Sequence, residues 1–142
     1  VFAHGYDPTL KTLFIWQGVT QYLNPQAVDS TLAFVAQNSG SGSKIIFDYM
    51  YTSLLGGAAG HGEIRNMRRY RAFSGEDLTF GIPEGQIETY LQKRGFTKVV
   101  DANHQLLTQK YFQPPKQVAS GYAIVSASVE NPGASLFSKL DQ

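Results

Sequence analysis

The segment TLFIWQGVTQYLNP, residues 12–25, decides the fold class of this chain. It contains a short apolar run that stops at Gln17-Gly18. A helix start follows within a few residues, because Asn24 is a favoured helix cap and Pro25 suits the first helical position. An apolar run of this length is typical of a strand that lies inside a parallel sheet with both faces covered. Since ligands in open α/β sheets bind beyond the carboxyl ends of such strands, the segment predicts an α/β fold with a ligand-binding edge just after residue 16.

Strand and helix patterns alternate along the rest of the chain. Apolar residues recur at helical spacing from Pro25 until Gly40, and a second helix is expected to open at Pro83 and to end at Gly95. Residues 51–80 show weak periodicity and are expected to pass over the end of the sheet that carries the site. The other expected elements are strands at 44–50, 96–100 and 122–129 and a short helix or turn at 105–112.

Length and composition indicate one α/β domain, expected over residues 1–130 and followed by a loosely ordered tail at 131–142. The chain has 142 residues, of which 42% are hydrophobic and 16% charged, as is ordinary for one globular core. A net charge of +1 argues against broad binding of nucleic acid. The lack of cysteine excludes disulfides, thiolate metal sites and cysteine nucleophiles. No apolar stretch reaches the roughly 18 residues of a membrane span, and we expect a cytoplasmic protein.

Three segments carry a resemblance to a known family: FIWQGVTQYL at 14–23, IFDY at 46–49, and FGIP at 80–83 running on to Gly95-Phe96. They resemble the second half of class I S-adenosylmethionine-dependent methyltransferases of the leucine carboxyl methyltransferase-like group. The resemblance implies a Rossmann-like sheet of parallel strands with flanking helices, in which a final antiparallel strand is inserted between two earlier strands. The glycine-rich cofactor loop and the acidic ribose-binding residue of that family precede this region and are not found in the sequence. We therefore expect the C-terminal part of such an enzyme, inactive as an isolated fragment.

The chemistry that the resemblance implies is transfer of a methyl group from S-adenosylmethionine to the oxygen of a small carboxylic or hydroxyl compound. Such a displacement depends mainly on positioning and on a dry pocket. A carboxylate acceptor is already ionised near neutral pH and needs no general base. No metal is required, and His4, His61 and His104 lack the spacing of metal ligands.

On the cofactor side, the resemblance singles out Gln17, Gly18 and Tyr22. Gln17 stands where the family usually has a glutamate that contacts the cofactor. A carboxylate can attract the positive groups of the cofactor, whereas the amide of Gln17 can only form hydrogen bonds with them. Gly18 allows close approach of the backbone, and Tyr22 falls on the family tyrosine and is the candidate catalytic residue of the methyl-transfer pocket. Structural alternatives stay open: Gln17 satisfying backbone groups, Gly18 serving a simple turn, and Tyr22 packing the helix start.

On the substrate side, Asp48 and Tyr49 end the second strand at the same edge of the sheet and are expected to reach the substrate. The alternative for Asp48 is a cap on the next turn. Arg65 and Arg69 are expected to share a helical face that grips an acidic substrate, and the alternative is a solvated basic face. The glycine-rich stretch 56–62 before them lacks the ending of a phosphate-binding P-loop and is interpreted as a lid or a plain loop.

Two other function classes stay open besides the enzyme. The first is a binding or assembly module that keeps the fold without methyl transfer, as the Gln17 departure favours. The second is nucleic-acid contact through the basic stretch 65–71, for which so short a patch is thin support. For the isolated chain we also expect self-association through the apolar strand at 13–16, or pairing of that strand with the missing N-terminal half, because an uncovered strand edge tends to pair with another chain.

Overall fold

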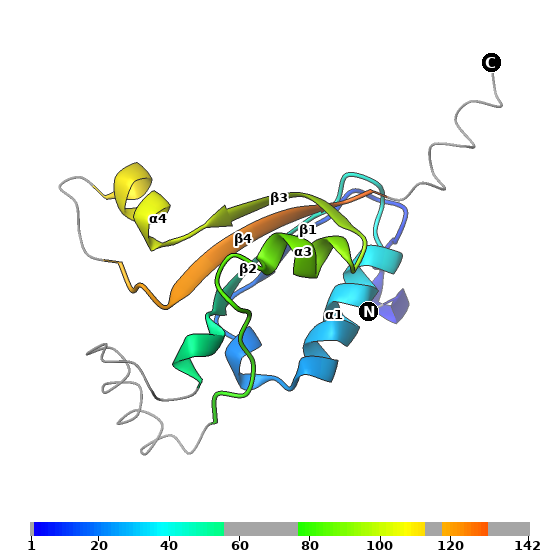
Figure 1. Cartoon of the computed structure of the whole chain (residues 1–142). Coiled ribbons are helices and arrows are strands. Elements are labelled where there is room, and N and C mark those ends of the chain that lie inside the picture. The colour runs from blue at the N-terminus through cyan, green and yellow to red at the C-terminus, as the bar shows by residue number, and fades with distance from the viewer. Residues whose placement is uncertain (1, 56–76, 113–117, 131–142) are drawn as a thin grey trace.

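The computed structural model of the chain describes residues 2–55, 77–112 and 118–130. Its centre is a four-stranded sheet in the order β1-β2-β4-β3 (Figure 1). β1 and β2 run parallel, and β4 runs antiparallel to both of its neighbours. The predicted insertion of the last strand between two earlier ones is therefore confirmed. The bounds are Leu13–Trp16 for β1, Lys44–Met50 for β2, Phe96–Ala102 for β3 and Tyr122–Val129 for β4.

Three α-helices lie in the described residues: α1 at Pro25–Gln37, α3 at Ile87–Gln92 and α4 at His104–Tyr111. The predicted start of α1 is confirmed, because the Asn24 side chain accepts a hydrogen bond from the Ala27 N–H at 2.8 Å. Short 3-10 helices, named η1 to η3, are formed by Phe2–His4, Thr20–Tyr22 and Thr52–Leu54.

The predicted start of the second helix at Pro83 is wrong by about one turn. Pro83 instead begins a tight turn that is closed by a 3.0 Å hydrogen bond from the Gln86 N–H to the Pro83 carbonyl oxygen. Gly85 in this turn has a φ of +75°, which a right-handed helix does not allow, so α3 begins only at Ile87. The predicted end is confirmed, since Gly95 has a φ of +86° just beyond the helix.

Helices α1 and α3 cover one face of the sheet (Figure 1). Alternate residues of the strands point into the layer between sheet and helices, where they form the hydrophobic core. Burial of these side chains is the main source of stability for the chain. The core includes Val28, Leu32, Val35, Ile45, Phe47, Tyr49, Ile87, Leu91, Val125 and Ala127.

The other face of the sheet is not covered by α1 or α3. Ile15 is 71% exposed, and Leu13, Val100 and Ile124 are also exposed on this face, which we call the open face. In the described residues β1 is an edge strand, as expected for this chain without the first half of the fold. A continuous apolar run shows that both faces suit burial, but it does not show what covers each face.

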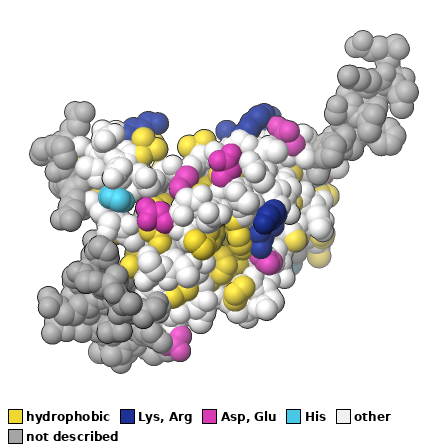
Figure 2. Space-filling model, viewed as in Figure 1, with side chains coloured by type: hydrophobic (Ala, Val, Ile, Leu, Met, Phe, Trp, Pro, Cys, Tyr) yellow, Lys and Arg dark blue, Asp and Glu magenta, His cyan; other side chains and the backbone are white. Residues whose placement is uncertain are grey.

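The described residues contain no helix with the length and apolar character needed to cross a membrane. They also contain no group of three His, Asp or Glu side chains placed to hold a metal ion. Figure 2 shows acidic, basic and hydrophobic side chains interspersed on the face in view, without a large area of one charge.

Candidate functional site

The candidate site is built where β1 and β2 end side by side. Gln17 and Gly18 directly follow β1, and Asp48 lies near the end of β2. The Asp48 carboxylate accepts a hydrogen bond from the Gly18 N–H at 2.6 Å, and the Thr20 hydroxyl donates to the Asp48 carbonyl oxygen at 2.8 Å. The structure therefore brings these three predicted site residues together at one edge of the sheet, while their binding roles stay predictions.

Gly18 has a backbone conformation that explains the glycine in this loop. Its φ is +71°, in the left-handed region that residues with a side chain rarely adopt. A Cβ added there would meet no described atom within 4 Å, so the space in front of the backbone is open. The turn and the close-approach interpretations of Gly18 are thus both compatible with its geometry.

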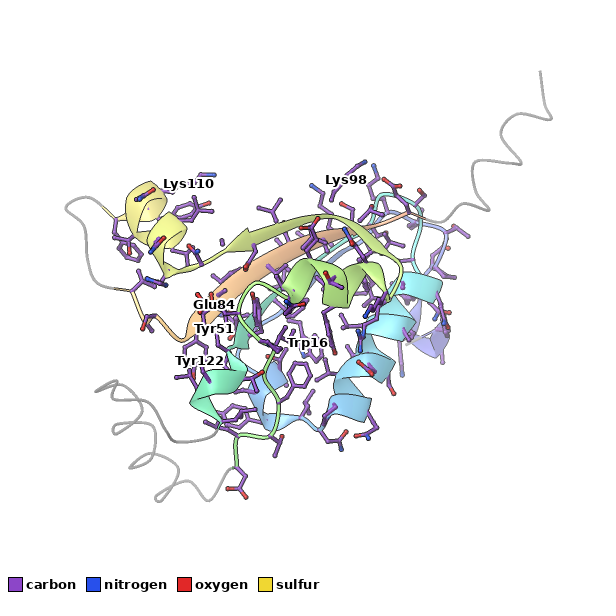
Figure 3. All side chains as sticks on the ribbon, viewed as in Figure 1. Trp16, Tyr51, Glu84, Lys98, Lys110 and Tyr122 are labelled. Atoms are coloured by element: carbon purple, nitrogen blue, oxygen red, sulfur yellow. The ribbon has the colours of Figure 1, made fainter. Side chains whose placement is uncertain are left out.

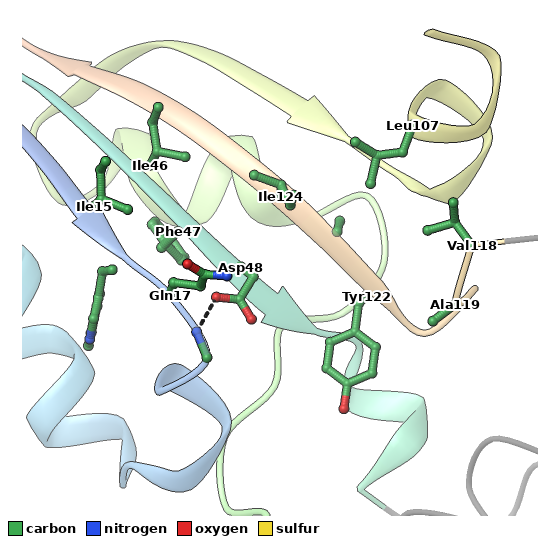
Figure 4. Close-up of a pocket in the computed structure, with 13 residues that line it drawn as sticks. Ile15, Gln17, Ile46, Phe47, Asp48, Leu107, Val118, Ala119, Tyr122 and Ile124 are labelled. Atoms are coloured by element: carbon green, nitrogen blue, oxygen red, sulfur yellow. Dashed lines mark hydrogen bonds between the residues drawn. The ribbon is translucent and has the colours of Figure 1, made fainter. Parts of the chain in front are cut away.

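A pocket of about 540 Å³ opens on the open face of the sheet next to this edge (Figure 4). Its volume lies in the range of pockets that take small molecules, roughly 300–1,000 Å³. The wall comes from the ends of β1 and β2, from the start of β4, from α4 and from the segment before β4. The lining residues are Ile15, Trp16, Gln17, Gly18, Ile46, Phe47, Asp48, Leu107, Val118, Ala119, Tyr122, Ala123 and Ile124.

Polar groups are few in this pocket and lie mainly at one end. The side chains of Gln17 and Asp48 lie beside each other, as Figure 4 shows, and Tyr122 adds a phenol from β4. None of the described lining residues is Lys, Arg or His. The pocket therefore combines an apolar wall with one carboxylate, one amide and one phenol.

Tyr22 is not among the residues that line the pocket. It belongs to η2 and is 38% exposed. The backbone N–H of Tyr22 donates to the Val19 carbonyl oxygen at 3.1 Å, which places the residue in the turn that leads to α1. The structure thus gives no geometric support to the catalytic role of Tyr22, and that role stays a prediction.

Tyr49 lies on the opposite side of the sheet from the Asp48 side chain. Successive strand residues point to opposite faces, so Asp48 faces the pocket while Tyr49 is fully buried in the core. The Tyr49 hydroxyl donates to the Asp101 carboxylate at 3.0 Å, and its ring packs edge-on against that of Tyr51. This corrects the expectation that Asp48 and Tyr49 reach one substrate together.

The hydroxyl of Tyr49 is held in its neutral form. Burial, followed by the negative charge of Asp101, raises the pKa of Tyr49 far above its ordinary value. Burial also raises the pKa of Asp101, although the hydrogen bond from Tyr49 acts in the opposite direction. Burial raises the pKa of Tyr51 as well, with smaller contributions from Asp101 and Glu84, and Figure 3 shows Tyr51 and Glu84 near the end of the sheet. These phenols are suited to donating hydrogen bonds rather than to acting as bases.

The remaining predicted site residues fall outside the described chain. They are Arg65 and Arg69, together with the glycine-rich stretch 56–62 and the rest of the basic stretch 65–71. The expected tail at 131–142 also lies outside it.

Most of the apolar wall of the pocket could not be predicted from the sequence. Leu107, Val118 and Ile124 lie far along the chain from Gln17, and only the fold brings them together. Ile124 lies between buried Ala123 and Val125 on β4 and faces the other side of the sheet, but the continuous apolar run does not show this in the sequence. No pattern in the sequence indicated Leu107 or Val118.

The comparisons with known proteins agree with this fold. The family model for leucine carboxyl methyltransferase matches residues 1–36, which include Gln17, Gly18 and Tyr22. A candidate S-adenosyl-L-methionine-dependent methyltransferase from Mycolicibacterium smegmatis is 32% identical over 109 residues, covering 67% of this chain and 34% of the relative. A similarly described protein from Mycolicibacterium gilvum is 27% identical over 130 residues, covering 85% of this chain and 41% of the relative.

Solved structures show the same fold at low sequence identity. A possible exported protein from Bordetella parapertussis superposes with a TM-score of 0.56 at 15% identity, covering 89% of this chain and 40% of that protein. The S-adenosylmethionine-dependent methyltransferase SibL, in its apo form, gives a TM-score of 0.52 at 14% identity, covering 89% of this chain and 32% of SibL.

The chain spans between about a third and two fifths of the length of the curated relatives that it matches. Its strand order, with the inserted antiparallel β4, is the one implied by the resemblance of residues 14–23 and 46–49 to the methyltransferases. The family-model match and the relatives lead to the same assignment. The chain is therefore similar, in sequence and in fold, to S-adenosylmethionine-dependent methyltransferases of the leucine carboxyl methyltransferase-like group.

Proposed function

We propose that this chain is the C-terminal part of an S-adenosylmethionine-dependent O-methyltransferase that acts on a small carboxylic or hydroxyl compound. In this proposal Gln17 and Gly18 contact the methyl donor, and Asp48 contacts the acceptor. The observation that carries the proposal is the joining of Gly18 and Asp48 at the strand ends, directly beside a pocket of about 540 Å³. The names of the curated relatives support the choice of donor.

The residues at this edge fit such a donor. S-adenosylmethionine supplies a methyl group on a positively charged sulfur, and a nearby carboxylate favours a positive charge. Asp48 provides that carboxylate, Gln17 provides an amide that can both donate and accept hydrogen bonds, and the space in front of Gly18 is open. A ligand that covers the apolar wall would exclude water from the reacting groups, which strengthens every electrostatic interaction inside the pocket.

We expect residues 1–142 alone to have no methyltransferase activity. The expected glycine-rich loop and acidic ribose-binding residue are not in the sequence, so the cofactor would meet only one wall of its site. The reading frame upstream of Val1 is expected to encode a strand, a glycine-rich turn and an acidic residue about 20 positions later. Unrelated sequence at that place would defeat the proposal.

Calorimetric titration with S-adenosylmethionine tests the proposal on two chains. We expect weak binding to residues 1–142 and much tighter binding to a chain that is extended through the upstream segment. If neither chain binds S-adenosylmethionine, the second candidate function, a non-catalytic binding or assembly module, is favoured. The amide of Gln17, which stands where the family usually has a glutamate, supports that candidate. Arg65 and Arg69 are further candidate substrate-binding residues in this proposal. Replacing each by Lys should weaken substrate affinity, because Lys lacks the planar, paired hydrogen-bond donors of Arg.

A further inference from the structure

Apart from the phenol of Tyr122, the lining of the pocket is apolar except at the end formed by Gln17 and Asp48, and this uneven lining restricts the acceptor. We infer that the acceptor is an uncharged compound with an apolar body and a hydroxyl group, rather than a carboxylate. The inference rests on the proposed function and narrows its substrate class. Three features support this acceptor class: the apolar side chains that line the pocket, the negative charge of Asp48, and a carboxylate placed to take the proton that a hydroxyl acceptor must lose.

The apolar wall favours an apolar body. Ile15 and Ile124 are 71% and 40% exposed, and both line the pocket together with Ile46, Leu107 and Val118. A ligand that covers these side chains removes apolar surface from water, which is favourable in proportion to the area buried. A compact, strongly hydrated substrate would leave this wall exposed.

The charge in the pocket disfavours an anion. Asp48 is the one charged residue among the described residues that line it, and no described lining residue is positive. Like charges within a few ångströms repel, and apolar surroundings screen that repulsion less than water does. A carboxylate acceptor placed beside Asp48 would therefore bind poorly.

A hydroxyl group, in contrast, fits the free side of Asp48. One carboxylate oxygen accepts the Gly18 N–H at 2.6 Å, and no described residue is bonded to the other oxygen. That second oxygen can accept a hydrogen bond from an acceptor hydroxyl. As the hydroxyl oxygen forms its bond to the methyl group, the bond between the methyl group and sulfur breaks and the sulfur keeps the electron pair. The hydroxyl proton then passes to Asp48, a transfer that a carboxylate acceptor would not need.

The test uses two probes of equal size, 2-naphthylmethanol and 2-naphthoate, titrated into the chain at neutral pH and followed by amide NMR. We expect changes in the amide chemical shifts of Ile15, Asp48 and Ile124. We also expect the alcohol to bind about tenfold more tightly than the carboxylate, a difference that a modest charge repulsion accounts for. In Asp48→Asn the amide oxygen can still accept the Gly18 N–H, so only the charge is lost, and we expect the two affinities to come within about threefold. Asp7→Asn is the matched control, because Asp7 is exposed in a turn outside the pocket and should leave the ratio unchanged.

Equal binding of both probes to the unmodified chain would overturn the inference, as would failure of both to bind or an unchanged ratio in Asp48→Asn. If that variant does not fold, the two probes are titrated into the unmodified chain at two salt concentrations. Raising the salt from about 0.02 M to about 0.5 M should screen the repulsion and bring the affinities of the two probes closer together. An unchanged ratio of the two affinities would contradict the inference. These probes need no methyl donor, so their result is independent of the titration with S-adenosylmethionine that tests the proposed function.

Discussion

Asp48 links the local structure of the site to its chemistry. Its carboxylate holds the Gly18 N–H, and its backbone carbonyl oxygen accepts the Thr20 hydroxyl, so one residue of β2 fixes the loop that follows β1. The same side chain is the negative charge of the pocket. The alternative of a simple cap is therefore partly right, because Asp48 does satisfy a backbone group, but that group belongs to the neighbouring strand end.

The two effects of Asp48 are separable by substitution. In Asp48→Ala the Gly18 N–H loses its partner, and we expect the Gly18 amide to exchange with solvent faster and the free energy of unfolding to fall by about 1 kcal/mol. Asp48→Asn should keep most of the protection, because the amide oxygen still accepts the bond. Hydrogen exchange by NMR and urea denaturation measure both quantities. Equal protection of the Gly18 amide in the Ala variant and the unmodified chain would contradict this account of the loop.

The buried phenols predict a loss of stability in alkali. Burial is the largest cause of a raised pKa at Tyr49, Tyr51 and Tyr90. Because each folded-state pKa lies above the unfolded value of 10.0, the stabilisation from the neutral phenol is complete below pH 10 and is lost as the pH rises through the folded-state value. Tyr49→Phe should lower the free energy of unfolding at neutral pH by about 1 kcal/mol through the lost bond to Asp101, and it should flatten the alkaline decline.

Urea midpoints between about pH 8 and pH 11 measure that decline. Tyr111→Phe is the matched control, because Tyr111 is 64% exposed and should keep the full pH dependence. An alkaline decline that is the same in the Tyr49 and Tyr111 variants would show that the buried phenol is not its cause.

At the scale of elements, the sequence predicted what local chemistry determines. The cap at Asn24, the terminator at Gly95 and the four strands all appear in the structure. The start of α3 was placed too early because proline at the start of a helix and proline at the start of a tight turn look alike, and the left-handed Gly85 decides between them. Whether each face of β1 is covered depends on contacts between distant segments, so the apolar run alone did not determine it.

The edge strand β1 carries the prediction of self-association. We propose that two copies of the chain pair through the unpaired edge of Leu13–Trp16, since exposed apolar edges tend to add another strand. In sedimentation velocity from about 10 µM to about 500 µM, the unmodified chain should shift toward a dimer, and Leu13→Glu should stay a monomer. Glutamate at this position lies across from Lys44, so the charge is tolerated within the chain.

Leu106→Glu serves as the control for this element. Leu106 is a 39% exposed residue on α4, away from the β1 edge, and its replacement should leave the association unchanged. A monomeric unmodified chain at all concentrations would refute the pairing, and so would equal loss of association in both variants.

At the scale of the whole molecule, the two faces of the sheet differ in what they do. One face is covered by α1 and α3 and supplies the core, while the open face carries the pocket (Figures 1 and 4). The order of the strands could be predicted from the resemblance of a few short segments to a known family. The residues of the pocket wall could not be predicted in this way, because they depend on where α4 and the segment before β4 pack against the sheet.

The central claim is that Gln17 and Gly18 bind the methyl donor at the strand-end edge, beside Asp48, which contacts the acceptor. The most direct measurement is an amide NMR titration of the chain with S-adenosylmethionine up to millimolar concentration, repeated on Gln17→Glu. We predict weak binding with the largest shifts at these three residues, and tighter binding in the Glu variant because a carboxylate attracts the positive sulfur. The gain should be smaller for S-adenosylhomocysteine, whose sulfur is neutral. Shifts centred on other parts of the chain, or no shifts at millimolar donor, would contradict the account.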